Sequence, residues 1–308
     1  MTRKIHGNDF TFYLPGMVRY GRERGRYPAI SITGAECQLL CEHCKGRLLD
    51  PMIKVTNAAA FLSTGKRFER SGAFGLLLSG GSDHRGRLPW HKYFGAISGL
   101  CQETLLYLSA HTGFPDPKTC HLLKESGVRQ ALLDVMGDEE TAKAIYHLEG
   151  MRPVLDAMEG ICDAGLQFVP HIVAGLSYGR ISAEYKAIEM ISRYAPSALV
   201  IVVLTPLKGT PMAHVSPPAP LEIARLIARA RCLMPEIPIA LGCERPRNRD
   251  GLEMERLSIM AGATRMAVWS EESIAFASQL GLRPRFQLTC CSLEYRVDFS
   301  SSGPQPIS

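Results

Sequence analysis

The chain has 308 residues, of which 46% are hydrophobic and 21% charged, and its formal net charge is +5. This composition is typical of a globular protein and excludes general disorder, a collagen-like repeat and a coiled coil. So mild a positive charge does not by itself indicate a nucleic-acid-binding protein. The longest apolar run, residues 198–204, is far shorter than the roughly 20 residues that a membrane helix needs. Residues 1–27 lack the apolar segment of a signal peptide, so we expect a cytoplasmic protein with reduced cysteines.

Eight short apolar runs predict strands that are buried on both faces. Each run is continuously apolar rather than alternating, and successive runs begin about 25–45 residues apart, the spacing of a strand–loop–helix unit. The predicted strands are Ala29–Thr33, Phe74–Ser79, Leu105–Ser109, Gln130–Val135, Phe168–Val173, Leu199–Leu204, Ile237–Leu241 and Arg265–Trp269. Apolar residues at helical spacing predict helices between them, at Ala142–Leu148, Glu184–Arg193 and Leu221–Leu233.

Eight such units predict an α/β fold, a (βα)8 TIM-like barrel over residues 29–270. Residues 1–28 would then form a short N-terminal extension, and residues 271–308 a C-terminal tail that could contribute ligands to a site. One wrongly assigned strand would leave an open or partial barrel instead.

Three of the ten cysteines, Cys37, Cys41 and Cys44, form a C-x₃-C-x₂-C motif directly after the first predicted strand. A loop with this spacing can bind one face of a 4Fe–4S cube and leave the fourth iron open to a small chelating molecule. Zinc is the alternative, but a closed structural zinc site needs four ligands. His43 could supply the fourth, although its neighbour Cys44 makes joint chelation of one ion awkward. The motif therefore predicts an open iron–sulfur site.

This motif, placed after the first strand of a βα barrel, resembles that of the radical S-adenosylmethionine (SAM) superfamily. The resemblance implies that the open iron binds the amino and carboxylate groups of SAM. It also implies that an electron, from a donor such as ferredoxin or flavodoxin, cleaves SAM to a 5′-deoxyadenosyl radical that abstracts hydrogen from a C–H bond. In such enzymes the cofactor carries the chemistry and the protein positions it. His43 is a departure, because family members usually have an aromatic residue there.

A glycine-rich segment follows the second predicted strand and consists of Ser79, Gly80, Gly81 and Ser82. It resembles the segment of the superfamily whose backbone carbonyls receive the amino group of SAM. Glycine allows a backbone to approach a ligand closely, but an ordinary strand-to-helix turn is the alternative.

Three further segments match the superfamily in the expected order. Asp134, at the end of the fourth predicted strand, could accept hydrogen bonds from ribose hydroxyls, or it could have a structural partner. His171 and Ile172 belong to a segment that resembles the one packing on adenine. Residues 206–211 resemble the PL-x-GTP turn of biotin-synthase-like members.

A narrower resemblance rests on residues 28–52 together with Tyr13–Met17 and Cys290–Leu293. They resemble the biotin-synthase-related group that includes the two-component, archaeal-type lipoyl synthases. This implies sulfur insertion into an octanoyl chain on an acyl or lipoyl carrier protein, with a paralogous radical SAM protein as partner. A radical SAM mutase, methyltransferase or cofactor-maturation enzyme is the alternative, and a non-enzymatic zinc or nucleic-acid-binding module is a remote one.

Sulfur insertion implies a sulfur source, which related enzymes obtain by sacrificing a second iron–sulfur cluster. Cys243 follows the seventh predicted strand and should face the barrel mouth, and Cys290 and Cys291 lie in a tail that could fold back over it. These three cysteines are the candidate ligands of an auxiliary cluster, with a vicinal disulfide or simple packing as the alternative. The other cysteines in predicted helices are interpreted as buried apolar side chains: Cys101, Cys120, Cys162 and Cys232.

Two basic stretches remain, Arg19–Arg26 and Arg245–Arg249. They are either solvated surface or a docking face for an acidic carrier protein, because complementary charge speeds encounter. Arg245 could instead contact a carboxylate or cap a cluster, and His111 either faces the pocket or is a core histidine. We expect neither a membrane nor a nucleic acid as partner.

Overall fold

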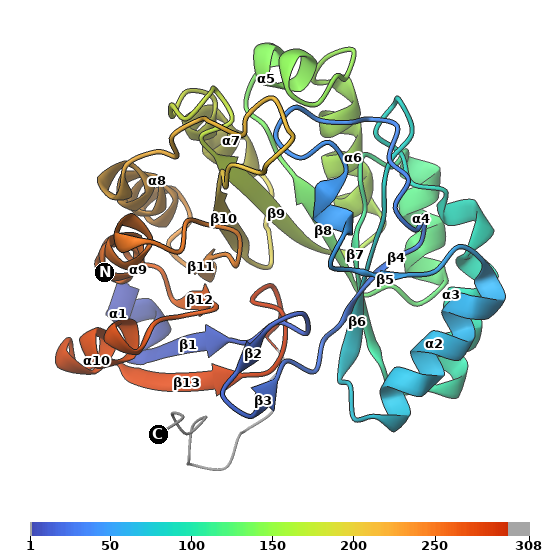
Figure 1. Ribbon diagram of the computed structural model, residues 1–308, viewed down its shortest axis with the longest axis horizontal. Helices are drawn as coiled ribbons and strands as arrows, with labels where there is room; N and C mark the ends of the chain where they lie inside the picture. The colour runs from blue at the N-terminus through green and yellow to red at the C-terminus, as the bar shows by residue number, and fades with distance from the viewer. Residues whose placement is uncertain (1, 295–308) are drawn as a thin grey trace. The chain divides into compact units, whose positions relative to one another are not determined.

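The computed structural model describes residues 2–294 of the chain (Figure 1). The chain forms two compact units, which we describe separately. Of the described residues, the first unit comprises 2–25, 170–206 and 215–294, and the second comprises 26–169 and 207–214. Within the described residues, no helix has the length and apolar character that crossing a membrane requires.

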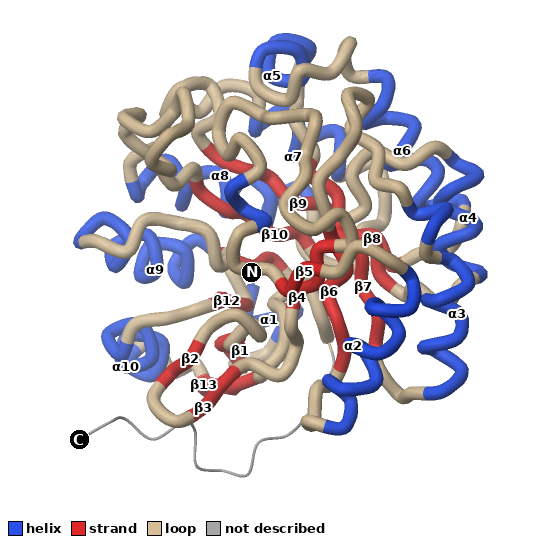
Figure 2. Tube along the Cα trace, turned by 45° about the vertical axis from the view of Figure 1, so that its right-hand side comes forward, coloured by secondary structure: helices blue, strands red, loops and turns tan. Residues whose placement is uncertain are grey.

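The second unit contains a parallel sheet in the order β8-β7-β6-β4-β5. Its helices lie along one side of these strands, with α2, α3 and α4 next to one another (Figures 1 and 2). Asn57, Asp116 and Asp138 cap α2, α4 and α5, because each side chain accepts a backbone N–H of the first turn. The elements are β4 (Ala29–Ser31), β5 (Ile53–Lys54), α2 (Ala58–Arg70), β6 (Gly75–Ser79), α3 (Phe94–Glu103), β7 (Tyr107–His111), α4 (Pro117–Glu125), β8 (Gln130–Asp134), α5 (Glu139–Ala144) and α6 (Arg152–Asp163), with short 3₁₀ helices at Arg47–Leu49 and Trp90–Lys92.

The first unit contains a parallel sheet in the order β13-β1-β12-β11-β10-β9 and a two-stranded antiparallel hairpin, β2–β3. Helices α8 and α9 pack on each other, as do α9 and α10. The elements are α1 (Thr2–His6), β1 (Asp9–Tyr13), β2 (Arg19–Tyr20), β3 (Glu23–Arg24), β9 (Gln167–Ala174), α7 (Glu184–Ile191), β10 (Leu199–Val203), α8 (Pro220–Leu233), β11 (Ile239–Leu241), α9 (Arg249–Ala261), β12 (Arg265–Ala267), α10 (Glu271–Gln279) and β13 (Arg283–Gln287).

The predicted fold class is confirmed. Each of the eight apolar runs overlaps a strand, the strands outside the β2–β3 hairpin pair in parallel, and helices alternate with them as in a TIM-like barrel. The helices predicted at Leu221–Leu233 and Glu184–Arg193 are α8 and α7. The helix predicted at Ala142–Leu148 begins and ends earlier, as α5, because Asp138 caps its first turn.

Both ends of the chain contribute strands that the sequence did not predict. Strand β1 lies between β12 and β13, and Phe12 pairs with Met266 on one side and with Phe286 on the other. Thus residues from the predicted N-terminal extension and from the predicted tail are built into the sheet of the first unit.

Candidate functional site

The cysteine motif occupies the loop between β4 and β5, in the second unit. Cys41 and Cys44 are buried, whereas Cys37 is partly exposed. A hydrogen bond from the Cys41 thiol lowers the pKa of Cys44 to about 4 against the effect of burial, and His43 adds to the lowering. The same hydrogen bond, together with burial and the nearby Cys37, raises the pKa of Cys41 well above its ordinary value. One thiol of the pair is therefore ready to ionise, as a soft-metal ligand has to be.

The backbone of this loop is wound tightly around the cysteines. Lys45 and Leu40 both have positive φ, 46° and 47°, which costs free energy in residues other than glycine. The Cys41 carbonyl accepts N–H groups from Cys44 at 3.1 Å and from Lys45 at 2.8 Å. The Lys45 ammonium in turn donates to Leu40 O at 2.8 Å and to Glu42 Oε1 at 2.7 Å. These bonds offset the strain and fix the directions of the cysteine side chains.

A histidine from a distant part of the second unit holds the loop. His147 follows α5, and its Nδ1 lies 2.9 Å from Leu39 O while its Nε2 lies 2.8 Å from Glu42 Oε1. Both partners are hydrogen-bond acceptors, so each contact joins a ring nitrogen to an acceptor oxygen. The Glu42 N–H also donates to Ile145 O at 2.9 Å. The sequence gives no signal for this clasp, because its partners are more than 100 residues apart.

The glycine-rich segment after β6 packs directly on the cysteine loop. The Ser82 carbonyl accepts the Gln38 N–H at 2.7 Å, and the Gly81 N–H donates to Thr33 Oγ1 at 2.7 Å. A Cβ on Gly81 would lie 1.9 Å from the Glu36 carbonyl oxygen and 2.6 Å from Cys37 Cα. Gly81 is therefore required for the close approach of these two segments, a role that the resemblance did not include.

Asp134 belongs to a cluster of polar and aromatic side chains at the ends of β7 and β8. Its carboxylate lies 3.4 Å from the Tyr146 hydroxyl and 3.8 Å from His111 Nε2. Burial, and next the negative charge of Asp134, raise the pKa of Tyr146 well above its ordinary value. The Tyr146 ring lies 5.4 Å from that of His43, and His43 Nδ1 is buried without a partner among the described residues. The sequence did not reveal Tyr146. Asp134 has the structural partners that were the alternative, and its contact with a ribose stays a prediction.

Two other predicted segments differ in what they contact. The turn after residue 206 adjoins the cysteine loop, because Arg47 donates a hydrogen bond to Lys208 O within the second unit. His171 and Ile172 lie in the first unit, buried in β9 and paired with Val200 and Ile201 of β10. Their packing on adenine stays a prediction.

The second predicted group of cysteines lies entirely in the first unit. Cys243 follows β11, Cys290 and Cys291 follow β13, and the thiols lie near enough to change one another's pKa. Burial, and next the nearby Cys290, raise the pKa of Cys243 to about 11. A hydrogen bond from Cys291 lowers the pKa of Cys290 to about 6. The structure thus brings the three predicted auxiliary ligands together.

Two buried side chains fix the segment that carries the vicinal cysteines. The Tyr13 hydroxyl donates to Leu293 O at 3.0 Å. Arg265 donates to the carbonyls of Cys291 and Leu293, each at 3.3 Å, and its guanidinium lies 5.9 Å from the centre of the Tyr13 ring. The segment after β13 is thereby attached to β1 and β12.

Arg245 is not part of a solvated surface or docking face; of the predicted alternatives, the structure shows contact with a carboxylate. It is 2% exposed and forms a 2.5 Å ion pair with Glu255. It also donates to Gly242 O at 2.6 Å and Ala267 O at 2.8 Å, and to Val268 O. Because Gly242 follows β11, Ala267 is the last residue of β12 and Val268 follows it, Arg245 holds the ends of both strands and the loop that contains Cys243.

Comparisons with known proteins find relatives in sequence and in fold. Residues 201–293 match the model of the Biotin and Thiamin Synthesis associated domain, which includes all three auxiliary candidates. A biotin synthase of Aromatoleum aromaticum is 30% identical over 141 residues, 42% of this chain and 43% of the relative. A biotin synthase of Acidithiobacillus ferrooxidans is 24% identical over 170 residues, 54% of this chain and 53% of the relative. The chain spans about half the length of these curated relatives or less.

Two solved structures share the fold. Methylornithine synthase (PylB) has a TM-score of 0.61 at 14% identity, covering 92% of this chain and 86% of that one. HydG, a maturase of the [FeFe]-hydrogenase, has a TM-score of 0.63 at 14% identity, covering 92% of this chain and 66% of that one. Sequence and fold together support the radical SAM superfamily. The narrower likeness to lipoyl synthases belongs to the proposal below.

The residues present suit the open cluster and the SAM molecule of the radical SAM superfamily. Three thiols lie on one loop and two of them are buried, and His43, between these two, has a buried Nδ1 without a partner among the described residues. A cube binds each thiolate through a different iron. No three His, Cys, Asp or Glu side chains of residues 2–294 are arranged to hold a single metal ion.

The remaining cysteines of the chain differ from one another in burial. All four lie in helices, as predicted. Cys120 is fully buried, Cys101 and Cys162 are partly buried, and Cys232 is exposed on α8. The interpretation as buried apolar side chains is therefore wrong for Cys232, because it lies on the solvent face of its amphipathic helix.

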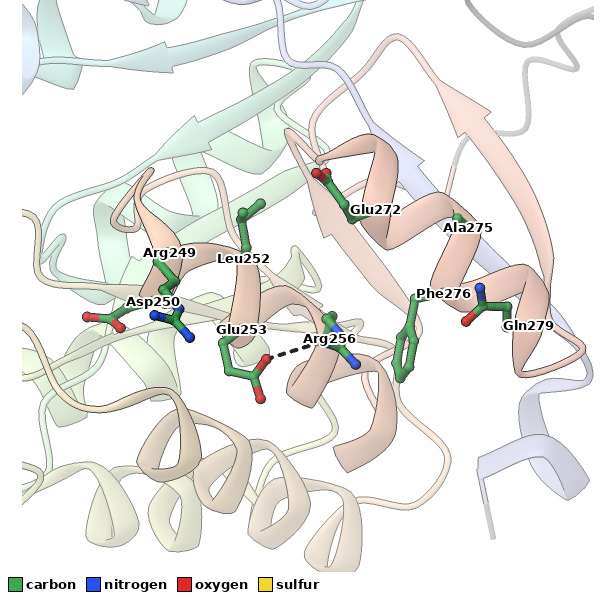
Figure 3. A pocket seen from close by; sticks show the side chains of 9 residues that line it. All are labelled: Arg249, Asp250, Leu252, Glu253, Arg256, Glu272, Ala275, Phe276 and Gln279. Carbon is green, nitrogen blue, oxygen red and sulfur yellow. Dashed lines mark ion pairs between the residues drawn. The ribbon is translucent and has the colours of Figure 1, made fainter.

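A cavity of about 680 Å³ lies elsewhere, between α9 and α10 of the first unit (Figure 3). Side chains of both helices line it, including Glu253, which pairs with Arg256 at 3.6 Å. The Arg256 guanidinium lies 4.9 Å from the centre of the Phe276 ring. None of the predicted cofactor-binding or cysteine residues lines this cavity, so we assign no cofactor to it.

Proposed function

We propose that this protein is a radical SAM enzyme whose open 4Fe–4S cluster is bound by Cys37, Cys41 and Cys44. The observation that carries the proposal is the placement of Cys37, Cys41 and Cys44 on one tightly wound loop, with Cys41 and Cys44 buried, where contact with Cys41 lowers the pKa of Cys44. When bound, the reduced cluster supplies the electron that cleaves SAM to the 5′-deoxyadenosyl radical.

The chain's own residues hold and shield this site. The His147–Glu42 clasp and the close packing of Gly81 fix the loop before any cofactor binds, which reduces the ordering cost of binding. Carbonyls of Ser79–Ser82 receive the SAM amino group in this proposal, and Asp134 receives ribose hydroxyls. The buried Tyr146 keeps water from the side of the loop where His43 lies.

We propose further that the radical serves sulfur insertion into an octanoyl chain on an acyl or lipoyl carrier protein. Support comes from the grouping of Cys243, Cys290 and Cys291, which would bind a second cluster as the sulfur source. Three soft donors from two loops suit iron–sulfur binding. Ferredoxin or flavodoxin would supply electrons, and a paralogous radical SAM protein would complete the pair.

The cofactor assignment is tested by Cys41→Ala in the reconstituted full-length protein. Three thiolates are the minimum for an open cube, so we expect iron to fall by roughly four per chain and 5′-deoxyadenosine production to stop. Cys232→Ala, which removes an exposed thiol from α8, is the matched control and should change neither quantity. Full 5′-deoxyadenosine production by the Cys41→Ala protein would refute the assignment.

A further inference from the structure

The β2–β3 hairpin carries three exposed arginines, Arg19, Arg22 and Arg24. None of them forms an ion pair with an acidic side chain among residues 2–294; Arg24 only donates to Gly16 O at 3.3 Å. Arg19 and Arg24 are directly opposite each other in the two-strand ladder. Like charges in that arrangement destabilise a hairpin, and an anionic partner would offset this cost.

The hairpin is attached beside the loop that contains Cys243. The Tyr20 ring lies 5.3 Å from the ring of Trp269, which follows β12. Arg247, half-exposed, donates to Cys243 O and to Val268 O. Both views show the hairpin next to the β1–β13 pair, at whose carboxyl end β1 leads into it (Figures 1 and 2). The hairpin and Arg247, far apart along the chain, therefore both contact the segment after β12, at Trp269 and Val268.

We propose that these four residues, Arg19, Arg22, Arg24 and Arg247, form a docking face for the acidic surface of the carrier protein that bears the acyl substrate. This inference rests on the proposed function, because it places the carrier beside Cys243, where sulfur would be delivered. Exposed arginines steer an acidic partner toward its site, and Met17, 41% exposed next to the hairpin, adds the apolar contact that interfaces favour. Single-stranded nucleic acid fits less well, because Tyr20 packs on Trp269 instead of offering a free ring for bases.

Charge reversal of the hairpin tests the docking face. The test variant is Arg19→Glu/Arg22→Glu. The matched control is Arg193→Glu/Arg225→Glu, which makes the same change in net charge at two other exposed arginines, one just after α7 and one in α8. Binding to an octanoylated lipoyl carrier domain is measured without SAM or reductant, at two ionic strengths. Cleavage of SAM is measured separately in all three proteins.

We expect the test variant to bind the carrier roughly tenfold or more weakly, with a smaller loss at high salt because surface charges are then screened. The control should bind like the wild type, and all three proteins should cleave SAM equally. If carrier binding is weakened equally in the test and control variants, or in neither, the proposed docking face is wrong. Wild-type binding to anionic lipid vesicles or single-stranded DNA that is as tight as to the carrier and depends on the same arginines would also overturn it. If the wild-type protein does not cleave SAM at all, the proposed function is contradicted, whatever the binding result.

Discussion

Gly81 shows how the absence of a single side chain determines the candidate site. The sequence indicates that glycine here admits a ligand, whereas the structure shows that it admits the cysteine loop itself. A Cβ at Gly81 would meet backbone atoms of Glu36 and Cys37, which cannot move without displacing the loop. A Cβ at Gly80 would meet only side-chain atoms of Thr33 and Ile32, at 3.1 Å and more.

We therefore predict different results for two single-methyl variants. Gly81→Ala should lose cluster iron and SAM binding together, because it displaces Cys37. Gly80→Ala should keep its iron, because side chains can adjust by a few tenths of an ångström. Iron per chain and SAM affinity, measured after reconstitution, provide the comparison. A Gly81→Ala protein with full iron and weakened SAM binding would contradict this reasoning and support direct contact with SAM.

At the scale of elements, the Arg245–Glu255 pair joins the ends of β11 and β12 to α9. Arg245 donates to carbonyls after both strands, and Glu255 Oε2 accepts hydrogen bonds from the hydroxyls of Ser270 and Ser273 at 2.7 and 2.6 Å. Val268, one of the acceptors, has a φ of 54°, which is unusual for a β-branched residue. The buried pair therefore maintains a strained turn next to Cys243.

Removing one charge of this pair should be costly. Glu255→Gln leaves the buried Arg245 without a counter-ion, and we expect a loss of about 3–5 kcal/mol in the free energy of unfolding. The double variant Arg245→Met/Glu255→Leu should be less destabilised than the single, because it leaves no buried charge unpaired. Urea denaturation of the three proteins measures both effects. A single variant as stable as the wild type would contradict this account.

The same pair gives the unfolding free energy a pH dependence with a defined sign. Burial alone would raise the pKa of Glu255, but Arg245 and the two serine hydroxyls outweigh it and lower that pKa below its ordinary value of 4.5. The folded state therefore gains stability above pH 4.5 and loses it as the pH falls through the lowered pKa. In the wild type we expect this acid component in urea denaturation, and in Glu255→Gln we expect it to be absent.

At the scale of the whole molecule, the sequence predicted the features that depend on neighbouring residues, such as the strands, and missed contacts between residues far apart in the chain. Continuous apolar runs predicted all eight strands of the barrel core, whereas the cluster role of the cysteine triplet, indicated by its spacing, stays a prediction. Strand β13 escaped prediction because Arg283 and Arg285 are exposed and Pro284 is unusual in a strand; it lies at a sheet edge, where proline is tolerated. Contacts across long sequence distances, such as that of His147 with Glu42, leave no periodic pattern to read.

The C-terminal segment follows the path that its sequence indicates. Helix α10 ends before Gly281, which has a φ of 72°, a conformation that glycine adopts readily. Strand β13 then runs parallel to β1 and so returns to the edge where β11 and β12 end. Cys290 and Cys291 follow within a few residues, which is how residues far apart in the sequence from Cys243 come to lie beside it.

The position of Cys290 and Cys291 beside Cys243 allows a test between the proposed sulfur insertion and other radical SAM reactions. A Cys290→Ala/Cys291→Ala variant should keep the cluster of the first motif and still cleave SAM, because that cluster has its own ligands in the second unit. It should transfer no sulfur to an octanoylated carrier, and its iron should fall by up to about four per chain, the content of one cubic cluster. Cys101→Ala/Cys162→Ala, which removes two partly buried helical thiols, is the matched control and should keep both iron and sulfur transfer. If the Cys290→Ala/Cys291→Ala protein retains all its iron and still yields thiolated product, the auxiliary cluster is wrong, and a mutase, methyltransferase or maturation reaction becomes the better explanation.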